Sequence, residues 1–201
     1  MHHWREDYFQ TLKDVAAEAR TFPEWADYAN FCAEYEKGLR SRALTVLERF
    51  ISSLECAPFA ERRRFVSWIL NRAEGREGGH MLVPHPLHRR VVEPTLLEWT
   101  LVEAQCAEPH RWLGDYEHLK LAIKLDPEDQ QARKKLVIRI LSRVGTSELP
   151  DRYIGSPGED LVLLNEAETL LQGLRSDEDR KRLSASITEE RALIRGYLDR
   201  Q

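Results

Sequence analysis

The chain has 201 residues, 30 basic and 34 acidic side chains, a formal net charge of -4 and an apolar fraction of 42%. This composition excludes a disordered acidic chain and a strongly basic nucleic-acid binder, and it predicts that about 70% of the extended-chain surface is buried on folding. Such a core needs no disulfides. The cysteines Cys32, Cys56 and Cys106 form no CxxC pair, so we expect reduced thiols.

Neither a secretory signal nor a membrane span is expected. The first ten residues, MHHWREDYFQ, carry charges and lack the apolar stretch of a signal peptide. No uncharged apolar run approaches the roughly 20 residues that cross a bilayer. We therefore predict a cytoplasmic protein without a membrane partner.

Helical periodicity dominates residues 1–74. Apolar side chains recur every three or four positions, as on one face of an amphipathic helix, and the pattern is interrupted near Pro23, Gly38 and Pro58. We expect four helices. Their apolar stripes are Tyr8, Leu12, Val15 and Ala19; Trp25, Tyr28, Cys32 and Tyr35; Ala43, Leu47, Phe50 and Leu54; and Val66, Ile69, Leu70 and Ala73.

Residues 75–94 interrupt this pattern with three glycines and three prolines. Because the residue before a proline is biased away from helical angles, we predict an irregular loop here, with the next helix starting at Pro94. The loop also contains apolar residues, so we expect it to be ordered and packed on the helices. These residues are Met81, Leu82, Val83, Leu87, Val91 and Val92.

Helical stripes return over residues 95–143, with breaks expected at Glu108-Pro109 and Asp126-Pro127. Residues 144–159 form a second irregular segment, and residues 160–201 form a final helical pair whose second helix starts at Ser176. The short breaks favour antiparallel neighbours. We thus predict a single all-α domain over 1–201, built of about nine helices in stacked hairpins.

The run from His118 to Leu136, HLKLAIKLDPEDQQARKKL, resembles the end of one tetratricopeptide repeat and the start of the next. Ala122, Asp126, Pro127 and Ala132 keep the spacing of that family, and the aromatic and small residues from 112 onward extend the resemblance to residues 112–136. The whole chain also resembles bacterial helical proteins of unassigned function. This resemblance implies stacked helices and, by analogy, a surface that binds another protein.

The first candidate site lies in the loop at residues 80–90. His85, His88, Arg89 and Arg90 form a polar group that suits an anion such as phosphate or carboxylate. Together with His80, the same histidines offer an alternative zinc site. The spacing HxxxxHxxH matches no metal motif, however, and packing of the loop without any ligand stays open.

The second candidate site lies around the sequence His110, Arg111 and Trp112, followed by Tyr116. Aromatic and Arg side chains contribute most of the contact energy at protein interfaces, so these four residues are candidates for binding a partner. They also suit plain core packing and helix-end charge complementarity. A Cys106–His110 nucleophile and base pair is a further, weaker alternative.

Nothing in the sequence indicates catalysis or a cofactor. Glycine-rich phosphate loops, GxSxG and HExxH are absent, and three basic clusters, at 62–64, 133–143 and 180–182, lie near acidic residues, which disfavours nucleic acid. The sequence therefore predicts a non-enzymatic module that binds another protein, of adaptor or immunity type in a bacterium. The alternatives are a protein that binds a small molecule, an anion or a metal through loop 80–90, with or without enzymatic activity, and a homo-oligomeric structural protein.

Overall fold

A computed structural model describes residues 6–144 and 155–200 of the chain. Within these ranges it contains ten α-helices of seven residues or more, a few shorter helical turns and no strand, which confirms the predicted all-α class. The chain divides into two compact units, residues 1–102 and 103–201. The predicted single domain over 1–201 stays a prediction. Each unit has a buried apolar core of its own.

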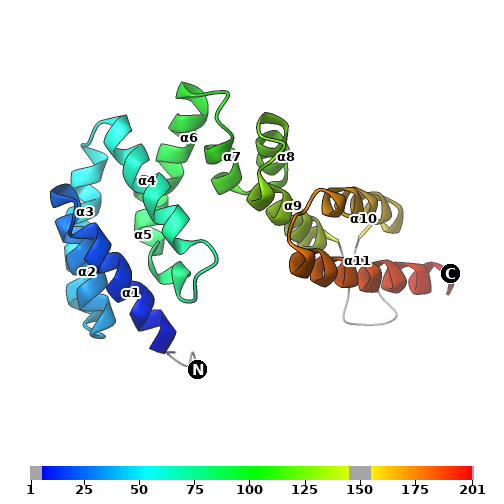
Figure 1. Ribbon diagram of the computed structural model, residues 1–201, viewed down its shortest axis with the longest axis horizontal. Helices are drawn as coiled ribbons and strands as arrows, with labels where there is room; N and C mark the ends of the chain where they lie inside the picture. The colour runs from blue at the N-terminus through cyan, green and yellow to red at the C-terminus, as the bar shows by residue number, and fades with distance from the viewer. Residues whose placement is uncertain (1–5, 145–154, 201) are drawn as a thin grey trace. The chain divides into compact units, whose positions relative to one another are not determined.

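The first unit is a helical array in which α1, α2 and α3 pack side by side and α4 packs against α6 (Figure 1). Its core is aromatic: the centre of the Phe65 ring lies 5.5 Å from that of Trp25, 5.0 Å from that of Tyr28 and 4.8 Å from that of Phe50. The long helices are α1 (Glu6–Ala19), α2 (Ala26–Glu36), α3 (Arg40–Glu55), α4 (Phe59–Ala73) and α6 (Glu93–Val102).

The four predicted N-terminal helices are confirmed, with boundaries that follow from their breakers. Pro23 starts a short 3-10 turn, η1 (Pro23–Trp25), which leads directly into α2. Gly38 adopts a positive φ of 77° between α2 and α3, a conformation that costs glycine little. Pro58 precedes α4, where its missing amide proton removes no helical hydrogen bond.

The expected loop at 75–94 is ordered and packed, as predicted, but its second half is helical. After η2 (Gly79–Met81), the chain forms α5 (His85–Leu87), the π-helix η3 (His88–Val92) and α6 without a break. The predicted helix start at Pro94 is therefore wrong. Pro94 has no amide proton to donate to the carbonyl four residues earlier. The wider π-turn just before it accommodates this missing hydrogen bond, so the helix continues.

Buried hydrogen bonds hold the non-helical half of this segment to the first unit. The buried Tyr28 hydroxyl donates to the Leu82 carbonyl at 2.7 Å, and the Thr11 hydroxyl donates to the Glu77 carbonyl at 2.8 Å. Burial raises the pKa of Tyr28 well above its ordinary value, so this phenol stays a donor. The segment is thus part of the core packing.

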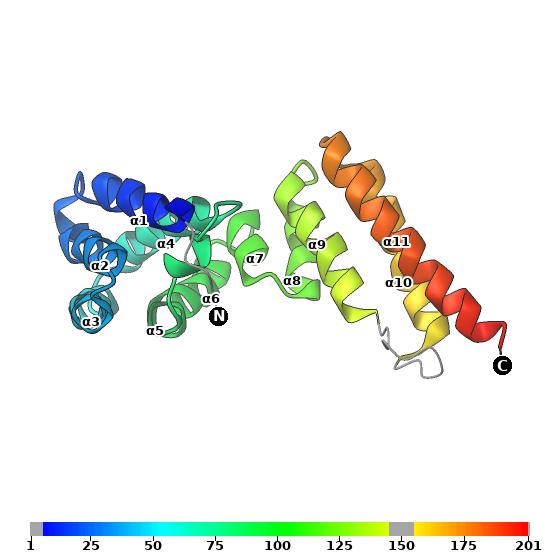
Figure 2. The same ribbon diagram turned by 90° about the horizontal axis from the view of Figure 1, so that it is seen from below.

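The second unit consists of consecutive packed helices, with α9, α10 and α11 in mutual contact (Figure 2). Small residues allow close approach, because Ala122, Ala132 and Ala167 are all fully buried where α8, α9 and α10 meet. The helices are α7 (Ala107–Leu113), α8 (Tyr116–Leu125), α9 (Gln130–Arg143), α10 (Pro157–Gln172) and α11 (Asp177–Leu198).

One predicted break in this unit is wrong. The helix α7 runs through Pro109, which lies in its first turn. The break after α6 falls earlier, at residues 103–106, and a second break at Gly114 divides the helix that was predicted to carry both Trp112 and Tyr116. Gly114 has a φ of 70°, and the Asp115 carboxylate then accepts from the His118 amide at 2.9 Å to start α8. Trp112 and Tyr116 therefore belong to different helices.

Two other predicted boundaries are confirmed. The helix α8 ends just before Asp126, and the Ser176 hydroxyl accepts from the Asp179 amide at 3.2 Å at the start of α11. The helix α10 starts at Pro157, three residues before the expected position. Most of the predicted irregular segment at 144–159 lies outside the described residues.

Candidate functional site

The three loop histidines do not come together. His80, His85 and His88 are exposed, and the His80 ring meets the Tyr8 ring edge-on at 5.8 Å. Within residues 6–144 and 155–200, no group of three or more His, Cys, Asp or Glu side chains is arranged to hold a metal ion. Nothing in the described part of the chain therefore supports the alternative zinc site at these three residues.

The two loop arginines are paired with carboxylates. Arg89 contacts Glu93 one helical turn later at 2.7 Å. Arg90 reaches back to α3, where it contacts Glu48 at 2.5 Å and Glu55 at 2.7 Å. Its hydrogen bond to Glu55, together with its charge, holds the pKa of Glu55 below the ordinary value. An anion would have to displace these carboxylates in order to bind Arg90. The geometry therefore favours a structural role, in which Arg90 links η3 to α3 through ion pairs.

The second predicted group does gather, at the joint between α7 and α8. His110 is 5% exposed and its Nδ1 lies 2.8 Å from Nδ1 of His118, with the two rings 5.0 Å apart. Burial and the nearby His118 lower the pKa of His110. Because its Nδ1 is committed to His118, this nitrogen cannot act as a base toward Cys106, which is the N-cap of α7.

Arg111 attaches this joint to α9. Its guanidinium donates to the Asp129 carboxylate at 3.0 Å, and the other oxygen of that carboxylate accepts from the Ala132 amide at 2.9 Å. The Asp129 side chain is only 3% exposed. One buried carboxylate therefore starts α9 and anchors α7 at the same time.

Trp112 and Tyr116 lie beside a regular set of cations on α9. We call Lys135, Arg139 and Arg143 the cationic row, because they follow each other at four-residue intervals on one helix face. Lys135 Nζ lies 4.0 Å from the centre of the Trp112 ring, and Arg143 Cζ lies 5.6 Å from that of Tyr116.

Arg139 sits between these two stacked pairs. Its Nε and Nη2 both donate to the Gly114 carbonyl, at 3.2 and 3.0 Å, at the turn that separates α7 from α8. The α7–α8 turn therefore contacts the middle member of the cationic row, and Trp112 and Tyr116 contact the two outer members. We call Trp112, Tyr116 and the cationic row together the α7–α9 surface.

Further polar contacts fix the two aromatic residues. The Tyr116 hydroxyl donates to the Glu166 carboxylate on α10, and Lys120 lies 3.6 Å from the same carboxylate. Burial and the contact with Glu166 raise the pKa of Tyr116. The Trp112 indole N–H donates to Glu108 at 3.3 Å. Both rings remain partly exposed, so they present a fixed surface to solvent.

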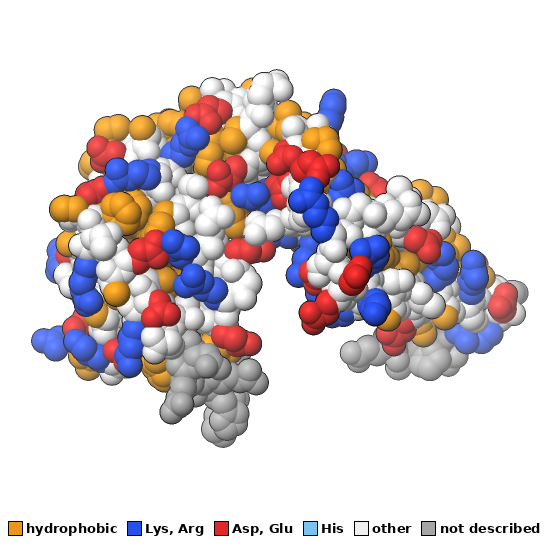
Figure 3. All heavy atoms as spheres, viewed as in Figure 1, with side chains coloured by type: hydrophobic (Ala, Val, Ile, Leu, Met, Phe, Trp, Pro, Cys, Tyr) orange, Lys and Arg blue, Asp and Glu red, His pale blue; other side chains and the backbone are white. Residues whose placement is uncertain are grey.

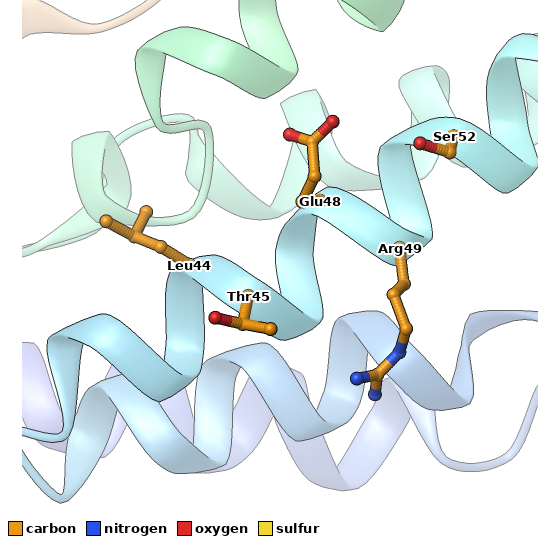
Figure 4. A pocket seen from close by; sticks show the side chains of 5 residues that line it. All are labelled: Leu44, Thr45, Glu48, Arg49 and Ser52. Carbon is orange, nitrogen blue, oxygen red and sulfur yellow. The ribbon is translucent and has the colours of Figure 1, made fainter.

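The first unit offers an open depression on α3 of about 690 Å³ (Figure 4). Its lining residues are Leu44, Thr45, Glu48, Arg49 and Ser52. The Glu48 and Arg49 side chains leave the helix in different directions, and each is paired, Glu48 with Arg90 and Arg49 with Asp27. Ligand sites require polar groups that converge, so this depression is a weak candidate for a small molecule.

Three exposed apolar side chains lie on α6. Leu97, Leu101 and Val102 are 47%, 83% and 58% exposed, and the exposed Pro94 lies on the same side as Leu97 and Leu101. On the face shown in Figure 3, by contrast, acidic and basic side chains are interspersed.

The sequence hypotheses included His110, Arg111, Trp112 and Tyr116 but missed the residues that connect them. His118 and Asp129 were not singled out, and the basic cluster at 133–143 was considered only as evidence against nucleic-acid binding. The four-residue spacing of the cationic row was the available signal. The α7–α8 turn that faces this row depends on tertiary packing.

Comparisons with protein families, curated proteins and solved structures find no match for this chain. Among the described residues, no helix combines the length and apolar character that a bilayer span requires. The tetratricopeptide resemblance stays a prediction.

Proposed function

We propose that the chain is a non-enzymatic module that binds another protein through the α7–α9 surface. The observation that carries this proposal is the placement of two partly exposed aromatic rings, Trp112 and Tyr116, against the cationic row. Trp, Tyr and Arg are the residues most enriched among those that dominate binding energy at protein interfaces.

Rigidity supports the same proposal. Trp112 is held by Glu108, Tyr116 by Glu166, and the α7–α8 turn by Arg139. A surface that is already ordered loses little conformational entropy when a partner docks, which favours affinity. An adaptor or immunity-type role in a bacterium agrees with this proposal.

The test is affinity capture from the cells that naturally produce the chain, followed by calorimetric titration of the purified partner. We expect Arg139→Ala, Arg143→Ala to weaken binding, whereas Lys181→Ala, Arg195→Ala, two exposed residues of α11, leave it unchanged. If the wild type captures nothing beyond what an unrelated bait captures, the proposed function is wrong. If both double variants bind like the wild type, the partner uses another surface.

Self-association is the second candidate function, and the exposed apolar residues of α6 favour it. Single exposed apolar side chains are ordinary, but Leu97 and Leu101 lie together on one helix face. Light scattering at increasing concentration tests this candidate. Self-association is supported if the molar mass of the wild type rises with concentration while that of Leu101→Lys stays at the monomer value. A wild type that is monomeric at all concentrations would rule it out.

A further inference from the structure

The cationic row is a regular array of positive charge. It belongs to a helix of 14 residues that contains five basic side chains and no acidic one. Because a helix rises about 1.5 Å per residue, members four positions apart are separated by about 6 Å along the axis. The α7–α9 surface thus presents positive groups at a defined spacing.

The two arginines of the row are exposed and keep donors for a ligand. None of the ion pairs among the described residues involves Arg139 or Arg143. Arg139 donates to a backbone carbonyl through Nε and Nη2, and Arg143 lies over the Tyr116 ring. A guanidinium has five N–H donors, so each arginine can still bind a carboxylate.

The other basic residues of α9 differ in this respect. Lys134 contacts Asp179 at 2.8 Å, and Arg133 donates to the Pro127 carbonyl at 2.7 Å. Of the five basic residues of α9, Arg139 and Arg143 are the two that are exposed.

We propose that the cationic row binds an acidic segment of the partner protein, with carboxylates repeating at about 6 Å, the rise of a helix that carries Glu at every fourth position. This inference rests on the proposed function and names the chemistry of the partner. The aromatic rings of Trp112 and Tyr116 flank the row and supply the apolar contact that fixes the segment beside it.

Single-stranded nucleic acid is the other polymer with regularly spaced negative charge, and the surface suits it less. Bases bind by stacking on open aromatic faces. Here Arg111 and Lys135 lie 4.9 and 4.0 Å from the centre of the Trp112 ring, so cations already occupy this ring.

The test uses the full chain and three fluorescently labelled probes in anisotropy titrations. The first probe is a helical peptide of about 16 residues with Glu at every fourth position, the second carries Gln at those positions, and the third is an oligothymidylate of similar length. We expect binding of the Glu peptide alone, weakening as salt rises. Arg139→Glu, Arg143→Glu should weaken that binding by about tenfold or more, and the matched reversal Lys181→Glu, Arg195→Glu should not.

Circular dichroism and thermal unfolding establish that each variant is folded, and Arg143→Glu alone provides a milder change. Equal binding of the Glu and Gln peptides, or tighter binding of the oligothymidylate, would overturn the inference. If the Glu peptide does not bind while a captured partner still binds the α7–α9 surface, the acidic chemistry is wrong and the proposed function stands. If no partner is captured either, the proposed function is also wrong.

Discussion

At the scale of single residues, the hydrogen bond between His110 and His118 makes the contact between α7 and α8 depend on the protonation of these two rings. A hydrogen bond between two Nδ1 atoms at 2.8 Å requires a proton on one nitrogen and a lone pair on the other. When both imidazoles are protonated, two N–H groups face each other and the bond is lost. Within this pair, burial and the neighbouring His118 ring lower the pKa of His110.

We therefore predict that the second unit loses stability as the pH falls below about 6.5, the value of an unfolded histidine. The folded pKa of His110 is lower than that value, because burial and His118 disfavour its charge. Between the two pKa values the unfolded chain binds the extra proton, so the free energy of unfolding falls by up to about 1.4 kcal/mol per pH unit.

Thermal unfolding between about pH 7.5 and pH 5.5 measures this effect. His110→Leu should flatten the pH dependence of the second unit, whatever its effect on absolute stability. His85→Leu, at an exposed histidine of the first unit, serves as the control and should leave that dependence intact. The same slope in wild type and His110→Leu would show that another group is responsible.

Close backbone approach makes Gly79 a second sensitive residue. A Cβ at this position would lie 2.1 Å from the Ala73 carbonyl oxygen at the end of α4. We predict that Gly79→Ala destabilises the first unit by about 1 to 3 kcal/mol, because the backbone must move apart. Urea unfolding measures this loss. Gly158→Ala, where a Cβ meets nothing within 4 Å, should change little, and equal midpoints for the two variants would contradict the argument.

At the scale of elements, Asp129 decides how α7 and α9 are joined. Replacing it with Ala removes the N-cap of α9 and leaves Arg111 without its buried partner, so we predict a loss of about 2 kcal/mol or more in the second unit. Asp129→Asn keeps the cap acceptor and should lose less. Ser176→Ala, which removes an exposed cap only, is the comparison for denaturant unfolding. A loss no larger than that of Ser176→Ala would mean that the Arg111 contact adds nothing.

Elements also show why some boundaries were predicted and others were not. The sequence locates α1 to α4 well, because each apolar stripe is bounded by Gly or Pro. Pro94 and Pro109 were misinterpreted, because a proline ends a helix only when its missing amide and its ring cannot be accommodated. Pro109 lies in a first turn, and Pro94 follows a π-turn. These solutions depend on what the flanking residues pack against.

At the scale of the molecule, the two units have separate cores, aromatic in the first and aliphatic in the second. We predict that fragments 1–102 and 103–201 each fold, with helical circular dichroism and a cooperative transition of their own. Phe65→Ala should lower the stability of the first unit by about 3 to 5 kcal/mol and leave the transition of the second unchanged. A single transition of the full chain that shifts as a whole would contradict this prediction.

The candidate site was predictable only in part. Residue type alone singled out His110, Arg111, Trp112 and Tyr116, because aromatic and cationic groups dominate recognition. It equally singled out His85, His88, Arg89 and Arg90, where exposed imidazoles and local carboxylate pairs give no convergent site. What distinguishes the two groups is what another helix supplies: Arg90 meets carboxylates of α3, whereas Trp112 and Tyr116 meet cations of α9.

The amino-acid sequence by itself determined the helical class, the apolar stripes and most breaks, because these depend on the spacing of residues within one turn or on the backbone of glycine and proline. Only the tertiary structure decided the two units, the π-turn before Pro94, the His110–His118 contact and the alignment of the cationic row with Trp112 and Tyr116. Each of these depends on side chains from separate helices meeting in space, and local spacing carries no information about such contacts.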